Sequence, residues 1–231
     1  MTDAPRTERG TRTRAKLLEA AELVFAEYGY SEASIVRITE AAGVAQGTFY
    51  LYFTGKLEIF EELVEDLNRR VRHAMTEAAA GATTRIESER AGFRGFFEFT
   101  AEHPALYRIV REAEFVSPNA LRLHYSRIVE GYIHGLTAAQ AQGDVGEFDP
   151  EIIAWILMGI GEMVGMRWVL WGNSDAKGDA RSDAKGGASD PTASGTAEVP
   201  QEVFEQMMQF IQRGLGVSSD TGSTTQGKER T

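Results

Sequence analysis

The chain has no cysteine among its 231 residues. Disulfide scaffolds and thiolate metal sites are therefore excluded, and a reducing compartment is the expected setting. Residues 1–16 are polar and contain no apolar segment of the kind that forms a secretory signal. We therefore expect a cytoplasmic protein. Because no stretch shows a strand pattern, we also expect an all-α fold.

The sequence also offers little that indicates catalysis or metal binding. His73, His103, His124 and His134 are scattered and lack the short spacing of a metal site. No nucleophile motif, glycine-rich phosphate loop or pair of carboxylates stands out. The sequence thus predicts a protein that is not an enzyme and that has no cofactor and no metal site.

The net charge of −10 is unevenly distributed. Residues 1–56 hold seven Lys/Arg and seven Asp/Glu, so all of the negative excess lies in residues 57–231. The first sixteen residues are locally basic, and we expect residues 1–10 to form a flexible basic arm. An acidic body lowers indiscriminate attraction to DNA and leaves affinity to a few placed contacts.

Apolar residues recur at helical spacing along most of the chain. Gly29, Gly43 and Gly143 stand where three of these segments end, as glycines commonly do. Residues 172–199 are rich in Gly, Ser, Ala and Asp, so we expect a disordered loop there and a disordered tail over 217–231. The spacing predicts helices at about 11–28, 34–42, 45–53, 84–102, 104–115, 118–142, 150–171 and 200–214, and a longer one that begins at Lys56.

Residues 150–171 differ from the other segments because hardly any polar face remains. The stretch is nearly long enough to span a bilayer. Glu162 and Arg167 lie inside it, however, and each costs roughly 2.5–3.5 kcal/mol near a bilayer centre. We therefore expect no membrane association. We interpret the segment as a helix that its own domain buries on one side and a partner subunit on the other.

Residues 34–53 predict two short helices joined by a glycine turn, which is the form of a helix-turn-helix motif. At about 100° per residue, Ile38, Phe49 and Phe53 point into a small core. Gly43 supplies the left-handed residue that a tight turn between helices requires. Gly47 then lies on the outward side of the second helix.

The outward side of this helix carries residue types that suit DNA. Gln46 can pair with an adenine edge, Leu51 can touch a thymine methyl group, and Gly47 lets the backbone approach base edges closely. Hydroxyl and basic side chains suit phosphate oxygens, and Ser34 adds the amino end of the preceding helix. The predicted DNA contacts are Arg12, Arg14, Ser34, Arg37, Ala45, Gln46, Gly47, Thr48, Tyr50, Leu51, Tyr52 and Lys56.

A helical hairpin inside an all-α bundle, without any DNA contact, would show the same spacing. The composition of the outward face separates the two interpretations. It presents Gly, Thr, Tyr and Leu, where a surface that meets only solvent would carry charges. This difference favours a DNA-reading unit.

A resemblance to a known family adds to this interpretation. About residues 11–71 resemble the amino-terminal domain of the TetR family of transcriptional repressors, through Gly29-Tyr30, Ser34, Ile38, Ala42-Gly43-Val44, Gly47-Thr48-Phe49-Tyr50-Leu51-Tyr52-Phe53 and Lys56. The resemblance implies an all-helical homodimer, with a three-helix DNA-binding domain at 11–56 and a helical effector-binding and dimerisation domain at 57–216. It also implies dimerisation through the last two helices, at about 150–171 and 200–214.

Four positions depart from the pattern of that family. Ala33 stands where a capping Thr is usual, and Gly55 where Ser, Asn or Asp often caps the next helix. Thr39 replaces a usual Ala, and Ala45 replaces a frequent Ser ahead of the reading helix. These changes concern base preference more than DNA binding itself.

The carboxyl-terminal part is rich in aromatic residues and Met, and residues 102–115 mix apolar with charged side chains. This segment loosely resembles family members that respond to fatty-acyl thioesters or related acids, so Arg108 or Arg111 could meet an anionic group. The predicted ligand contacts are Phe97, Tyr107, Arg108, Arg111, Phe115, Tyr125, Tyr132, Trp155, Met158, Glu162 and Trp168.

Together these features predict a homodimeric repressor that a small hydrophobic or acyl-type effector releases from a palindromic operator in double-stranded DNA. Two reading helices, one per subunit, would enter successive major grooves. A DNA-binding regulator without an effector remains open as an alternative, and so does a helical lipid-binding protein or enzyme built on the same bundle.

Overall fold

The computed structural model describes residues 8–171 and 199–217. The predicted loop at 172–199 and the predicted tail at 217–231 lie outside this part, except for Val199 and Val217 at their edges. The predicted arm at 1–10 needs a correction, because α1 begins at Glu8. Glu8 and Arg12 form an ion pair one helical turn apart, which favours this earlier start.

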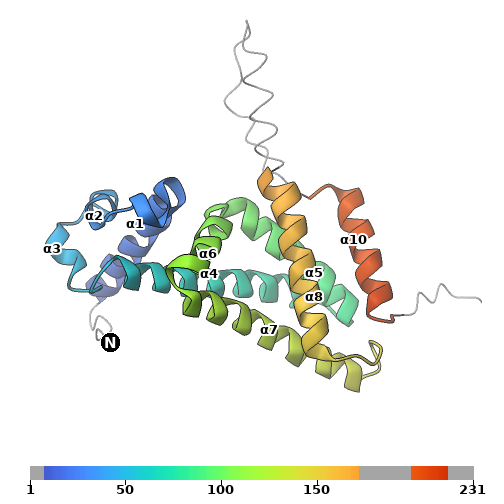
Figure 1. Ribbon diagram of the computed structural model, residues 1–231. Helices are drawn as coiled ribbons and strands as arrows, with labels where there is room; N and C mark the ends of the chain where they lie inside the picture. The colour runs from blue at the N-terminus through green and yellow to red at the C-terminus, as the bar shows by residue number, and fades with distance from the viewer. Residues whose placement is uncertain (1–7, 172–198, 218–231) are drawn as a thin grey trace, which may run out of the picture.

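The described residues form helices and no strand, as predicted. Figure 1 shows α1, α2 and α3 at one end of the molecule, α8 and α10 at the other, and α4 running from the first group into the second. The helices are α1 Glu8–Glu32, α2 Ile35–Ala42, α3 Gln46–Phe49, α4 Lys56–Ala79, α5 Arg85–Glu102, α6 Ala105–Val116, α7 Pro118–Ala141, α8 Pro150–Val164, its π-helical continuation η1 Gly165–Leu170, and α10 Gln201–Gly214.

Glycines and capping side chains set the ends of these helices. Gly29 and Gly43 both have a positive φ, at 71° and 66°, and the chain leaves α1 and α2 at these residues as predicted. Beyond Gly29 a short helical turn continues to Glu32. Thr84 begins α5 with a complete capping box, in which Glu87 reaches back to the chain before the helix.

The third helix is shorter than the sequence predicts. It ends at Phe49 and not at Phe53, because residues 50–52 form turns. The amide of Leu51 donates to Thr48 O and that of Tyr52 to Phe49 O, each three residues back. These tighter turns bring Phe53 into the core and redirect the chain into α4.

Two clusters of buried side chains form the core. The first joins α1, α2 and α3 to α4 and α6, and the second joins α5, α7, α8 and α10. The buried residues of α4, such as Phe60 and Leu67, belong to the same cluster as Leu17 and Phe25 of α1. The predicted boundary at residue 56 therefore falls at the start of a helix that both parts share.

Among the described residues, one helical segment, Pro150–Leu170, is long enough and apolar enough to cross a membrane. Length and composition of this kind are weak evidence for a span, because core helices of soluble proteins also show them. Only 28% of its most apolar window is buried within the chain. The remainder leaves an apolar face uncovered on α8.

Candidate DNA-reading surface and effector cavity

The short helix α3 is anchored from behind by two phenyl rings. Phe49 and Phe53 are fully buried, and their ring centroids lie 5.4 Å apart. Ile38 of α2 is fully buried in the same cluster. Gly43 connects the two helices, and its amide donates to Glu40 O. The helix-turn-helix arrangement expected from the sequence is therefore present.

The opposite side of α3 is open to solvent. Gln46 and Gly47 are exposed, and Tyr50 and Leu51 continue this surface with 53% and 73% of their area exposed. A Cβ atom added to Gly47 would meet no other atom within 4 Å. The backbone at Gly47, flanked by the side chains of Gln46, Tyr50 and Leu51, is thus accessible to a binding partner.

Two other predicted contacts of this unit lie nearer to the core. Ala45 is exposed at the start of α3, but Thr48 is partly buried, and Tyr52 packs against the buried cluster. The sequence predicts a DNA contact for Tyr52. Its placement against the buried cluster favours a core position instead.

Ser34 and Arg37 stand at the amino end of α2. The Ser34 hydroxyl accepts the amide of Arg37 at 3.2 Å, so this residue caps the helix where Ala33, which is buried, cannot. The Arg37 guanidinium lies 4.2 Å from the centroid of the Tyr28 ring and remains exposed. Both residues border the open side of the unit.

The structure gives Lys56 a task other than the predicted phosphate contact. Its ammonium donates to the carbonyls of Tyr30, Ser31 and Ala33 at 2.7, 3.2 and 2.8 Å. It also lies 4.5 Å from the centroid of the Tyr30 ring. All three donors of the ammonium thus hold the end of α1, which is a structural role.

The two predicted arginine contacts of α1 are also paired. Arg14 forms a two-pronged ion pair with Glu62 of α4 and lies over the Phe53 ring, whereas Arg12 pairs with Glu8 at 2.8 Å. Arg14 therefore holds α1 to α4. Arg12 is exposed, and water screening makes its ion pair weak, so it stays available to an approaching phosphate.

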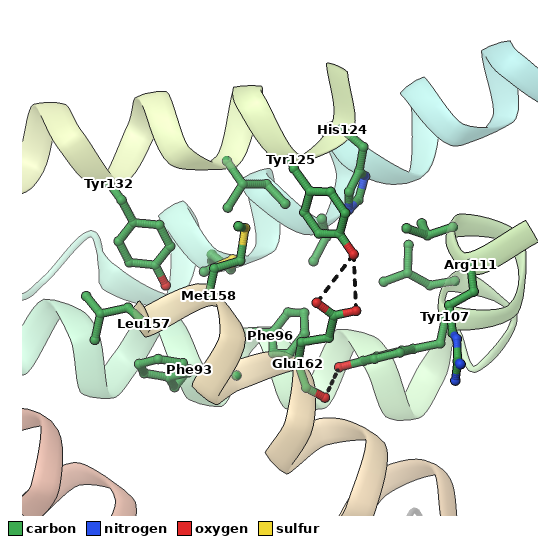
Figure 2. Close-up of a pocket in the computed structure, with 16 residues that line it drawn as sticks. Phe93, Phe96, Tyr107, Arg111, His124, Tyr125, Tyr132, Leu157, Met158 and Glu162 are labelled. Carbon is green, nitrogen blue, oxygen red and sulfur yellow. Dashed lines mark hydrogen bonds between the residues drawn. The ribbon is translucent and has the colours of Figure 1, made fainter. Parts of the chain in front are cut away.

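A second candidate site is an apolar cavity inside the larger helical part. It lies between α4, α5, α6, α7 and α8, and Figure 2 shows phenyl and phenol rings around it. Its volume is about 60 Å³. A few water molecules fill such a space, whereas drug-sized ligands occupy pockets of roughly 300–1,000 Å³. A ligand of that size needs the cavity to widen.

The polar groups of the cavity meet at Glu162. The Tyr125 hydroxyl donates to the Glu162 carboxylate at 3.1 Å, and the Tyr107 hydroxyl donates to the Glu162 backbone carbonyl at 3.0 Å (Figure 2). Burial and the nearby carboxylate raise the pKa of both phenols. Both phenols therefore stay protonated as donors at neutral pH.

His124 lines the same cavity as a neutral imidazole. Burial, and to a smaller extent the charge of Arg72, lower its pKa to about 4. The Asn68 amide contacts His124 Nδ1 at 3.3 Å and donates to its backbone carbonyl at 2.9 Å. The imidazole adds no positive charge to the cavity at neutral pH.

Six of the predicted ligand contacts line the cavity: Tyr107, Arg111, Tyr125, Tyr132, Met158 and Glu162. The other five do not. Phe97 is buried in the core beside the cavity, whereas Phe115 points outward with 84% of its area exposed. Arg108 donates to Ala26 O and Glu27 O of α1.

Two tryptophans complete this correction. Trp155 lies beside the Tyr125 ring but is half exposed, and Trp168 lies below Arg167 on the π-helical segment.

Most of the apolar lining of the cavity was not predicted from the sequence. Phe93 and Phe96 could have been found from the aromatic run of α5, but the remaining residues carry no signal beyond ordinary helical spacing: Val71, Met75, Leu106, Val110, His124, Ile128, Leu157 and Gly161.

Helix α6 connects the cavity to the reading unit. Its cavity side carries Tyr107 and Arg111, and its other side contacts the end of α1. There Glu112 accepts the amide of Tyr30 at 2.7 Å, and Arg108 donates to the Ala26 carbonyl at 2.6 Å. Movement of α6 would therefore be transmitted to α1.

An open helix-turn-helix face mounted on a larger helical body is typical of DNA-binding regulators. Residues 17–63 match the model of the bacterial regulatory proteins of the tetR family. The uncharacterized HTH-type transcriptional regulator YdgC of Bacillus subtilis is 32% identical over 173 residues, which are 72% of this chain and 86% of that protein. The chain belongs to the TetR family, and it is a transcriptional regulator and not an enzyme.

Other relatives share shorter stretches. The Fatty acid metabolism regulator protein of Bacillus subtilis is 30% identical over 129 residues, which cover 55% of this chain and 66% of that protein. The HTH-type transcriptional activator FasR of Mycolicibacterium smegmatis is 30% identical over 113 residues, about half of each chain. The solved structure of the fatty acid degradation regulator FadR from Bacillus halodurans shares the fold, with a TM-score of 0.65 at 22% identity over 86% of this chain and 94% of that chain.

Proposed function

We propose that this protein is a homodimeric, cytoplasmic repressor that binds a palindromic operator and is released by a small hydrophobic effector. The observation that carries the proposal is the open face of α3 around Gly47, which Phe49 and Phe53 hold from behind. In a dimer, two such faces enter successive major grooves about one helical turn apart. Gln46, Tyr50 and Leu51 are then the side chains that reach the duplex.

The dimer is supported by the apolar face of α8 and α10. Ile152, Ile156 and Met163 of α8 and Phe210 of α10 are each about half exposed or more in the single chain. An apolar surface of this kind commonly marks an interaction site. In the proposed dimer, a second copy packs on the same two helices and covers this apolar face, which is then not available to a membrane.

The effector is supported by the cavity and by one relative. The cavity is lined almost wholly by apolar and aromatic side chains, which suit a hydrophobic molecule. The name of the Bacillus subtilis fatty acid metabolism regulator favours an acyl-type molecule, an acyl thioester among them. An effector that prefers the form with misaligned reading helices would release the DNA.

Selection of bound duplexes from a random pool with the purified protein tests the DNA-binding part. We expect recovery of two inverted half-sites, and the Gln46→Ala variant should lose preference at one base pair of each half-site by about 1–3 kcal/mol. Recovery of single, unpaired half-sites would contradict the palindrome. One relative, FasR, is named as an activator, so activation must be tested too. Transcription from a promoter that carries the selected site, measured with and without the protein, distinguishes repression from activation.

A further inference from the structure

The carboxylate of Glu162 is set among aromatic rings in the cavity and has no cationic partner nearby. Among the residues that the structure describes, no Lys, Arg or His nitrogen lies within 4.0 Å of it. The hydrogen bond that it accepts comes from the neutral phenol of Tyr125. Glu162 is only partly buried, and none of these cations contacts its carboxylate, so the carboxylate can still accept a cationic partner.

Arg111 and His124 are the basic residues of the cavity lining, and neither contacts the Glu162 carboxylate. Figure 2 shows the Arg111 side chain extending away from Glu162, and its guanidinium contacts the Met166 sulfur at 3.7 Å. His124 is neutral, since burial lowers its pKa to about 4. Arg111 still lines the cavity, and its charge acts on the Tyr125 hydroxyl, but no cation of the described residues contacts the Glu162 carboxylate directly.

Aromatic faces add to the attraction for a positive group. Phe93, Phe96, Tyr107, Tyr125 and Tyr132 all line the cavity, and ring faces attract cations within about 6 Å of their centroids. A ligand carboxylate at the same place would lie beside Glu162 and would be repelled. The helix also changes from α to π shortly after Glu162, a deviation frequently found at functional sites.

We propose that Glu162 binds the positively charged head group of a hydrophobic effector, an ammonium or amidinium ion whose apolar part fills the widened cavity. This inference rests on the proposed function, since it names the chemical class of the effector. It distinguishes a hydrophobic cation from the acyl-type effector that the name of one relative suggests. Tyr125 turns from the carboxylate to make room, and Tyr107 remains on the backbone carbonyl of Glu162.

Three probes of one chain length test the proposal: octylammonium, octanoate and octanol, with octanoyl-coenzyme A as a fourth. Calorimetric titration of the full-length protein should give octylammonium an affinity at least about tenfold above octanol, because an ion pair with charge-assisted hydrogen bonds is added. Octanoate should bind more weakly than octanol. Equal affinity for the cation and the alcohol, or tighter binding of octanoate or the thioester, would overturn the proposal.

The Glu162→Gln variant locates the charge. It should lose the preference for octylammonium over octanol, whereas Glu130→Gln, at an exposed position of α7, should behave as the wild type. A Glu162→Gln variant that still prefers the cation would place the site elsewhere. The comparison of octylammonium with octanol uses the wild-type protein, so it tests the proposal even if the Glu162→Gln variant folds poorly.

Failure of the proposed function is visible in a separate measurement. Binding of the selected duplex by wild type and by Glu162→Gln, without any probe, reports the DNA-binding part alone. Binding of octylammonium without release of that duplex would leave the cation site intact and would contradict the effector role. Release by octanoyl-coenzyme A and not by octylammonium would contradict the cation and support the acyl-type effector.

Discussion

At the scale of single residues, the open position of Gly47 separates stability from DNA binding. A methyl group added there meets no atom of the protein, so Gly47→Ala lowers the conformational freedom of the unfolded chain without a clash. The same methyl group lies on the face that we assign to the duplex. One substitution is thus expected to move two properties in opposite directions.

We predict that Gly47→Ala raises the free energy of unfolding by about 0.5–1 kcal/mol and weakens binding to the selected duplex by about 1 kcal/mol or more. Denaturant unfolding and a fluorescence anisotropy titration measure the two effects. Gly131→Ala is the matched control, because Gly131 is also exposed and unobstructed but lies on α7, and it should change stability alone. Unchanged duplex affinity in Gly47→Ala would show that this backbone does not meet the DNA.

Residue types and spacing predict which side chains are buried near the turn, but not which charges are already paired. Phe49, Phe53 and Ile38 follow from the helical period alone. The partners of Lys56 lie more than twenty positions away, and Glu62 lies forty-eight positions from Arg14. Such pairs depend on the packing of α1 against α4, which a pattern along one helix does not contain.

At the scale of elements, α6 contacts the cavity on one side and the end of α1 on the other. The α1 end is unusual, since Gly29 has a positive φ and the Tyr30 amide donates to a side chain of α6. A Cβ atom on Gly29 would approach Glu112 Oε1 to 2.6 Å, so the glycine also permits this close contact. The orientation of α1 is therefore tied to that of α6.

We predict that Glu112→Ala speeds amide hydrogen exchange at Tyr30 and lowers the free energy of unfolding by about 1–3 kcal/mol, because the amide loses a charged acceptor. Exchange followed by nuclear magnetic resonance checks this. Glu114→Ala, at an exposed position of the same helix, should leave the Tyr30 amide unchanged. Equal exchange rates in both variants would mean that the contact does not hold the end of α1.

Helix positions were predictable to within a few residues for most of the amphipathic segments. α2, α5, α6, α7 and α10 show this agreement at both ends, and α4 shows it at its start. The end of α3 was wrong, because the apolar period continues through Phe53 while the backbone already turns at Tyr50. No local pattern indicates the π-helical segment η1; at its first residue, Gly165, an added Cβ atom would approach the Tyr107 hydroxyl to 2.7 Å.

At the scale of the whole molecule, the uncovered face of α8 is the feature that a single chain leaves unexplained. The near absence of polar residues at 150–171 predicted a helix covered from two sides, and the structure covers one. The cavity, by contrast, could not be outlined from sequence, because residues from five helices meet there only after packing.

We predict that Ile156→Arg converts the protein to a monomer and lowers its affinity for the palindromic duplex by at least about tenfold, since a buried unpaired charge opposes association. Sedimentation velocity gives the oligomeric state. Leu123→Arg places the same charge at an exposed leucine of α7 and should remain dimeric. A dimeric Ile156→Arg protein would move the interface away from α8.

The small volume of the cavity has a consequence for timing. A molecule larger than a few waters cannot enter until the surrounding helices separate, so its entry waits for a spontaneous opening. The observed rate of uptake should then level off as the concentration of the molecule rises, at the rate of that opening. A stopped-flow trace would show this plateau, and a cell that carries the protein would respond after a delay that more inducer does not shorten.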